Sequence, residues 1–228
     1  MKRQLMAVPP LSNSAVATIE APQALGRTFD VVEFSARLAI GLVFTLFAIR
    51  IANDAIATGR MTGLLLLASE SLVVVLTIVR RSACMVDRSW WTRVLTTMSM
   101  AGPPLVYPAH VVPLAPEAAT VAMSAVGLLV AIAGKLSLGR SFGLLPANRG
   151  VVCTGCYRLL RHPIYLGYLI THVAIVVANP TAWNTAVLLV ADTALLRRAV
   201  SEERTLAQDP EYRDYMQRVR WRIVPMVF

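Results

Sequence analysis

The stretch Ala118–Leu138 reads AATVAMSAVGLLVAIAGKLSL. The hydrocarbon core of a bilayer is roughly 30 Å thick and an α-helix rises about 1.5 Å per residue, so a helix needs about 20 mostly apolar residues to cross it. Ala118–Leu138 meets this requirement and predicts a membrane-spanning helix.

Composition extends this interpretation to the whole chain. The 228 residues are 56% hydrophobic and 15% charged. A soluble domain of this size cannot bury so much apolar surface, so the surplus is expected to face lipid. The formal net charge is nevertheless +9, which predicts contact with anionic headgroups or acidic ligands. The Lys and Arg residues flank apolar runs instead of lining one polar face, so nucleic acid is not expected as a partner.

Five further apolar segments are predicted to span, the last two of which are short and would tilt little or lie in a thinned region, so the expected fold is an all-α integral membrane protein with about six transmembrane helices. The third span, about Val94–Leu114, contains four prolines, each of which removes a backbone donor. This span is therefore expected to be broken, as a kinked helix or a re-entrant pair of half-helices. The remaining segments are Phe34–Ala52, Met61–Val79, Ile164–Ala178 and Ala182–Leu196.

Basic residues are concentrated in alternate connections. They occur between spans two and three, between spans four and five, and after span six, whereas the other connections carry few. Because cytoplasmic connections are rich in Lys and Arg, six spans with both termini in the cytoplasm satisfy every connection. The residues are Arg80, Arg81, Arg88 and Arg93; Lys135, Arg140, Arg149, Arg158 and Arg161; and Arg197 and Arg198.

The chain is expected to form one domain. Residues 1–33 predict a mobile or surface-lying leader, residues 34–138 hold spans one to four, and residues 139–228 hold a loop, spans five and six and a C-terminal helix. The tail from Arg197 to Arg222 alternates charge at helical spacing. It predicts an amphipathic helix on the membrane face, interrupted at Asp209-Pro210.

The loop between spans four and five is the expected place for chemistry. It contains Gly139–Gly143, Asn148–Val152 and Gly155–Arg158, followed by the motif Arg161–Gly167, which reads RHPIYLG. Glycines allow a ligand to approach the backbone, and Pro163 suits the first turn of a helix. A preference for basic cytoplasmic loops would explain the charge but not this combination of motifs.

The motif R-H-P-x-Y-x-G lies at Arg161–Gly167 and is preceded by G-x-Y at Gly155–Tyr157. With these motifs the chain resembles a prokaryotic-type member of the isoprenylcysteine carboxyl methyltransferase family, and also the related phospholipid N-methyltransferases. The similarity extends from about Leu138 to Pro225. It includes Asn179-Pro180, then Arg198 with Glu202-Glu203 and Leu206, and finally Tyr212, Tyr215 and Pro225.

The resemblance implies a cytoplasm-facing pocket for S-adenosyl-L-methionine and a lipidic or hydrophobic acceptor that arrives from the bilayer. It implies that Arg198 and Glu203 are the catalytic residues, and that Arg198 and Asn179 contact the substrate. The residues implied to contact the cofactor are Arg149, Gly150, Val151 and Val152 along it, Tyr157 packed on it, His162, Pro163, Ile164 and Tyr165 around it, and Glu202 on its polar groups.

Methyl transfer from a sulfonium requires alignment of the reacting groups and no metal. A carboxylate acceptor could be oriented by Arg198 without a general base. An amine acceptor must lose a proton, for which Glu203 and His162 are the candidates. The residues leave this choice open.

Two other functions stay open. Sterol and steroid reductases resemble this family in their C-terminal helices and bind a nicotinamide dinucleotide, but the loop Gly139–Arg161 is short for the contacts of a pyrophosphate. A non-catalytic membrane scaffold is the other alternative, but it would give the motif residues no function.

Cys153 and Cys156 resemble half of a zinc or redox site. Because no second half is present in the sequence, no metal is expected.

Three further polar residues lie in or near the apolar segments. Glu70, in the middle of span two, is costly in lipid and is expected to face the bundle or a dimer partner. His110 and His172 are expected to be structural polar groups.

Overall fold

The computed structural model of the chain describes residues 61–81, 83, 85–87, 89–106, 111–145 and 147–227, together with isolated helical positions between residues 38 and 56. The predicted leader, most of the predicted span Phe34–Ala52, and the residues Cys84, Arg88 and His110 lie outside these residues.

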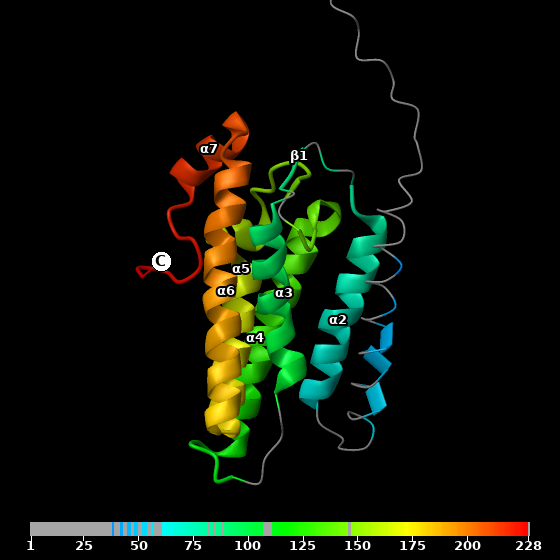
Figure 1. Cartoon of the computed structure of the whole chain (residues 1–228), viewed down its shortest axis with the longest axis vertical. Coiled ribbons are helices and arrows are strands. Elements are labelled where there is room, and N and C mark those ends of the chain that lie inside the picture. Colours follow the sequence, from blue (N-terminus) through cyan, green and yellow to red (C-terminus); the bar gives the residue numbers. More distant parts are fainter. Residues whose placement is uncertain are drawn as a thin grey trace, which may run out of the picture.

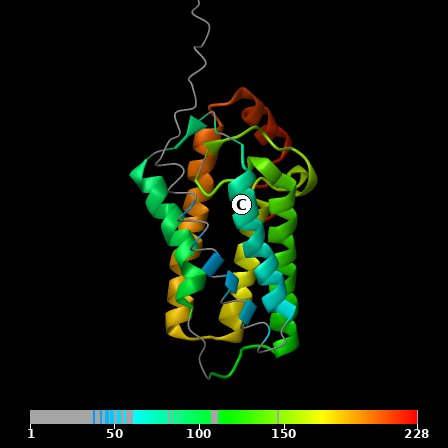
Figure 2. The same cartoon turned by 90° about the vertical axis from the view of Figure 1, so that its right-hand side faces the viewer.

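The described chain is helical, and most of its helices stand side by side along the long axis of the molecule (Figure 1). The view turned by 90° shows the same side-by-side arrangement of the helices (Figure 2). The helices are α2 (Met61–Val79), α3 (Trp90–Leu105), α4 (Glu117–Leu138), α5 (Pro163–Ala178), α6 (Ala182–Leu206) and α7 (Pro210–Arg218). Short 3-10 turns occupy Gly139–Ser141 and Gly155–Arg158, and the two-residue strands β1 (Met85–Val86) and β2 (Ala147–Asn148) pair antiparallel.

One end of the bundle carries most of the irregular structure. The short helix α7 lies there, together with β1 and the loop that joins α4 to α5 (Figure 1). Residues 111–116, which precede α4, and the turn from α5 to α6 lie at the opposite end. We call the first of these the α7 end. The three basic segments that were predicted to share one side of the membrane all have residues at the α7 end.

Helices α4 and α5 are in backbone contact at two glycines. A Cβ placed on Gly167 would lie 2.5 Å from the carbonyl oxygen of Gly127 and 2.6 Å from the backbone nitrogen of Ala131. A Cβ placed on Gly127 would lie 2.7 Å from the carbonyl oxygen of Gly167. Small residues at a helix crossing allow this approach, which is frequent between helices in membranes. The contact fixes α5, and with it the start of the RHP motif, against α4.

The third predicted span is shorter and more regular than expected. Helix α3 begins at Trp90, where the side chain of Ser89 caps it by accepting a hydrogen bond from the backbone N–H of Thr92 at 3.2 Å. It runs without a break through Pro103 and Pro104 in its last turn and ends at Leu105. Helix α3 therefore covers only part of the predicted segment Val94–Leu114: it ends just after Pro103 and Pro104, and residues 111–116 are not helical, so whether the segment spans or re-enters stays a prediction.

The last predicted span is longer than expected. Helix α6 continues from Ala182 to Leu206 instead of ending at Leu196. Ala199 is fully buried, and Arg198 and Glu202 pair one turn apart at 3.3 Å, so packing and side-chain pairing extend the helix. The predicted tail helix is thus divided between the end of α6 and α7, with the interruption at Asp209-Pro210 as predicted.

The apolar character of the bundle agrees with an all-α membrane protein. The helix Glu117–Ser141 is long and apolar enough to cross a bilayer, and Ala68–Val79 and Pro163–Ala178 are shorter apolar helices. The presence of six transmembrane helices stays a prediction.

Candidate functional site

The RHP motif lies at the start of α5, at the α7 end of the bundle. His162 is the residue before the helix and Pro163 is its first residue, where the absence of an N–H has no cost. The backbone N–H groups of Arg161 and His162 donate to the carbonyl oxygens of Trp221 and Arg222 at 3.0 and 2.8 Å. The motif is therefore held between α5 and the C-terminal residues of the chain.

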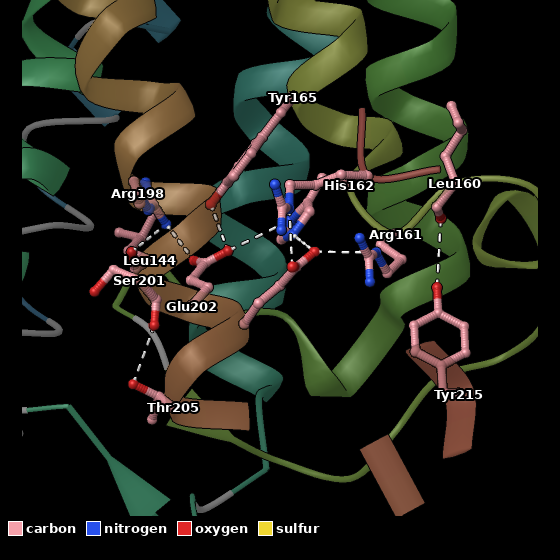
Figure 3. A network of polar contacts seen from close by, with 12 residues as sticks. Leu144, Leu160, Arg161, His162, Tyr165, Arg198, Ser201, Glu202, Thr205 and Tyr215 are labelled. Carbon is pink, nitrogen blue, oxygen red and sulfur yellow. Dashed lines mark hydrogen bonds and ion pairs between the residues drawn. The ribbon is translucent and has the colours of Figure 1, made fainter. Parts of the chain in front are cut away.

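Glu203 is the centre of a cluster of charged groups, and it contacts Arg161 and His162, which are labelled in Figure 3. One carboxylate oxygen lies 3.1 Å from Nε2 of His162 and 3.1 Å from Nε of Arg161, and the other accepts from Nε of Arg222 at 2.8 Å. The side chain of Glu203 is only 4% exposed. Burial by itself raises the pKa of Glu203, but the hydrogen bond to His162 and the nearby positive charges outweigh it and leave the pKa below its ordinary value.

Glu202 organises a second group of side chains next to the first. It accepts a hydrogen bond from the hydroxyl of Tyr165 at 2.7 Å and one from Arg198 at 3.3 Å. Its carboxylate also lies 3.6 Å from Nδ1 of His162. The imidazole of His162 thus stands between the two glutamates, and its ring stacks on that of Tyr165 with centroids 5.1 Å apart.

Arg198 links this group to the loop before α5. Its guanidinium donates to the carbonyl oxygen of Leu144 and lies over the ring of Tyr165, 5.4 Å from the centroid. The side chain is 7% exposed, and its buried Nε–H has no hydrogen-bond partner. A buried donor without a partner is uncommon and indicates a place for a ligand acceptor atom.

The loop before α5 is fixed by its own side chains. Asn148 accepts from the backbone N–H of Gly150 at 2.9 Å and donates to Asp209 at 2.6 Å, which joins the loop to the start of α7. Gly150 has a φ of 97°, a conformation that other residues adopt only with strain. The guanidinium of Arg149 packs against Gly143, where a Cβ would overlap Nη1.

A cluster of tyrosines supports the loop from the other side. The hydroxyl of Tyr215 donates to the carbonyl oxygen of Tyr157 at 2.8 Å, and Tyr157, Tyr212 and Tyr215 are all buried together with Val219. Burial raises the pKa of each tyrosine, so the phenols stay neutral at physiological pH. Tyr212 and Tyr215 therefore pack on the loop and do not form an exposed face of the tail.

The structure brings most of the predicted site residues to one place. His162, Pro163, Ile164 and Tyr165 begin α5, Arg198, Glu202 and Glu203 end α6, and Tyr157 and the segment Arg149–Val152 belong to the loop beside them. Asn179 is the exception, because it follows the last residue of α5 at the opposite end of the bundle. A helix of 16 residues is about 24 Å long, so Asn179 does not share a site with Arg198.

Several contacts of the site were missed by the sequence analysis. Arg222 contacts Glu203 from 19 residues away, and Asn148 contacts Asp209 from 61 residues away. Arg161 was recognised only as part of a motif and a basic loop, although it contacts Glu203. No local spacing signals such pairs, because only the packing of α6 and the tail against the loop brings them together.

A hollow of about 180 Å³ lies away from this cluster, between α5 and α6. Its lining is apolar apart from Thr185 and the pair formed by His172 and Asp192, whose Nδ1 and carboxylate are hydrogen-bonded. The prediction that His172 is a structural polar group agrees with this pairing. Glu70 faces the bundle, with its carboxylate 3.8 Å from Nζ of Lys135.

Comparison with known proteins found a similar family for part of the chain. Residues 117–208 match the model of the isoprenylcysteine carboxyl methyltransferase (ICMT) family. A comparison with the curated proteins gave no match. The matched residues run from the start of α4 to just beyond α6, and they include the RHP motif and both glutamates. The resemblance predicted from Arg161–Gly167 is therefore supported: residues 117–208, which contain this motif, are similar to the isoprenylcysteine carboxyl methyltransferase family.

Proposed function

We propose that the protein is an integral membrane methyltransferase that transfers a methyl group from S-adenosyl-L-methionine to a lipidic or hydrophobic acceptor. The observation that carries this proposal is the coincidence of the family match with a buried cluster of complementary charges. His162 and Tyr165 come from the middle of the matched region, Arg198, Glu202 and Glu203 come from near its end, and the five meet at the α7 end of the bundle.

The residues present fit S-adenosyl-L-methionine. When bound, the cofactor supplies an electrophilic methyl group on a positively charged sulfur. The ring of Tyr165 offers cation–π attraction to a positive group, and the oxygens of Glu202 accept hydrogen bonds from hydroxyl or ammonium groups. The unpartnered Nε–H of Arg198 is a donor for a carboxylate. Arg149, Gly150, Val151 and Val152 would follow the cofactor, with Tyr157 packed behind them.

The charge of the cluster favours a carboxylate acceptor over an amine. Three arginines, Arg161, Arg198 and Arg222, contact the two carboxylates of Glu202 and Glu203, so the cations in these contacts outnumber the anions before His162 is considered. Both glutamates already have cationic partners, and the lowered pKa makes Glu203 a weak base. An amine acceptor requires such a base, whereas a carboxylate is already deprotonated at neutral pH.

We further propose that the bundle crosses the membrane about six times with its α7 end in the cytoplasm. Exposed tryptophans lie near both ends of the bundle: Trp90 is 72% exposed at the start of α3, and Trp183 is 59% exposed at the start of α6. Tryptophan favours the two interfaces of a membrane, and the basic segments favour the cytoplasmic side. The lipidic acceptor would then enter from the bilayer.

Ligand-dependent thermal stabilisation of the detergent-solubilised protein tests the cofactor. S-adenosylhomocysteine should raise the midpoint of unfolding, and NADPH should not, because only a ligand of the folded state stabilises it. The Glu202→Gln variant should lose most of this response, whereas Glu211→Gln, an exposed glutamate in the first turn of α7, should keep it. Stabilisation by NADPH alone would instead support a reductase, and a response to neither ligand would support a scaffold.

The acceptor is tested with radiolabelled S-adenosyl-L-methionine and a lipid extract. The proposal predicts that label enters the organic phase and is released as methanol by mild alkali, since methyl esters are hydrolysed by alkali and N-methyl groups are not. Label that survives alkali would show an amine acceptor and contradict the preference drawn from the charges.

A further inference from the structure

The last residues of the chain form one wall of the charged cluster. The carbonyl oxygens of Trp221 and Arg222 accept hydrogen bonds from the backbone N–H groups of Arg161 and His162. Val219 and Ile223, on either side, are 7% and 0% exposed. We call Val219–Ile223 the C-terminal segment. It lies beyond residue 208, where the family match ends.

Both neighbours of Arg222 restrict its position. Ile223 packs in the core with Tyr165, Leu195 and Ala199, while Trp221 is bound through its carbonyl oxygen to Arg161. The backbone at Arg222 is therefore fixed against the start of α5. Its side chain, 24% exposed, reaches across to Glu203 on α6.

The contact of Arg222 determines how the carboxylate of Glu203 is turned. Nε of Arg222 donates to one oxygen at 2.8 Å, which leaves the other oxygen facing His162 and Arg161 at 3.1 Å each. A carboxylate with a fixed orientation fixes its partners in turn, and here the partner is the imidazole that stacks on Tyr165. The chain of contacts runs from Arg222 through Glu203 to His162.

We propose that Arg222 is a positioning residue of the cofactor site, which acts by orienting Glu203 so that Glu203 holds His162 in place. This inference rests on the proposed function. It extends the site beyond the matched region, to a residue that binds no ligand itself.

The groups that face Glu203 determine how its protonation changes when Arg222 is removed. They are Arg161 and His162 from the segment before α5, Arg222 from the C-terminal segment, and the phenol of Tyr212 from α7, with Glu202 adjacent on α6. Without Arg222, Glu203 loses one of its cations and becomes easier to protonate. The acid limb of cofactor binding should then move to higher pH.

The experiment measures the affinity of the purified full-length protein for S-adenosylhomocysteine from about pH 3.5, below the ordinary pKa of a glutamate, to about pH 8. Arg222→Met keeps the aliphatic stem and the backbone hydrogen bonds of the segment but removes the guanidinium. It should weaken binding roughly 10- to 100-fold, the range typical when a group that orients a ligand-binding side chain is lost. Arg222→Lys should restore part of the affinity, and Arg220→Ala, an exposed arginine two residues earlier, should match the wild type.

A double-mutant cycle with Glu203→Gln separates positioning from a general structural role. If Arg222 acts through Glu203, then Arg222→Met should have little further effect in the Glu203→Gln background, because the two residues are coupled. Equal fold-losses in both backgrounds would overturn the inference, as would wild-type affinity in Arg222→Met. If the methionine variant does not fold, the cycle is run with Arg222→Lys.

The outcome distinguishes this inference from the proposed function. Failure of the wild-type protein to bind S-adenosylhomocysteine would overturn the proposed function and with it the inference. Wild-type binding that is insensitive to Arg222→Met would overturn the inference alone.

Discussion

The ammonium group of Lys135 donates to both the carbonyl and the hydroxyl oxygen of Ser69, at 2.9 and 2.7 Å, and so joins α4 to α2 inside the bundle. Lys135 is completely buried, with the ring of Tyr168 5.4 Å away and the carboxylate of Glu70 3.8 Å away. A buried lysine is tolerated only with such partners. This side chain of α4 therefore contributes to the position of α2, together with the packing of Val73 and Leu76 in the core.

Replacing Lys135 should destabilise the bundle. Lys135→Ala removes the donor to Ser69 and leaves Glu70 without its cation, and loss of one partner of a buried pair costs about 3 kcal/mol. Lys135→Met fills the volume and should lose less. Thermal unfolding in detergent measures the difference, and an unchanged midpoint for Lys135→Ala would show that α2 is held by other contacts.

Enlarging Gly167 should separate α4 from α5. In Gly167→Ala, the new Cβ would meet the backbone of Gly127 and Ala131 at 2.5 and 2.6 Å, distances that force the helices apart. Overpacking of this kind costs about 1–3 kcal/mol. Val173→Leu also adds volume to α5 but at a side chain that is 52% exposed, so it should leave the unfolding midpoint unchanged. Equal effects of the two substitutions would contradict the close contact.

The hydroxyl of Tyr165 should matter for the cofactor more than for folding. Tyr165→Phe keeps the ring on which His162 stacks but removes the hydrogen bond to Glu202. A loss of about 1.4 kcal/mol, typical for a hydrogen bond to a charged group, would weaken binding of S-adenosylhomocysteine about tenfold. Tyr168→Phe on the same helix serves as the control, and isothermal titration compares the two. Unchanged affinity in Tyr165→Phe would exclude this hydroxyl from the site.

Stability should fall in acid through Glu203. Its pKa is lower in the folded protein than the ordinary value of 4.5, so its ionised form stabilises the fold. This contribution is complete above the ordinary value and is lost as the pH falls through the folded pKa. Glu203→Gln should therefore unfold more easily at neutral pH and show a flatter decline in unfolding midpoint below about pH 4.5. The same pH dependence in variant and wild type would assign the acid sensitivity to another group.

The bounds of several helices could be read directly from the chain. Helix α2 has the predicted bounds, while α4 and α5 begin one residue earlier than expected and end as predicted. Apolar runs, a proline in the first turn and the Asn179-Pro180 turn are local features, and local features determine where a helix begins and ends. The RHP motif and the glutamate pair were also sufficient to predict the family to which residues 117–208 are similar.

The extent of α6 and the completeness of the cluster were decided by tertiary structure. The charged residues after Leu196 gave no reason to continue an apolar span, yet Ala199 and Glu203 are buried because the loop, α5 and the C-terminal segment enclose them. The same packing places Arg222 on Glu203 and leaves Asn179 at the far end. The sequence by itself determined which segments are helical and apolar and which motif they carry, since these depend on neighbouring residues. Only the tertiary structure decided which distant charges meet, since a buried carboxylate takes its partners from whatever the packing places beside it.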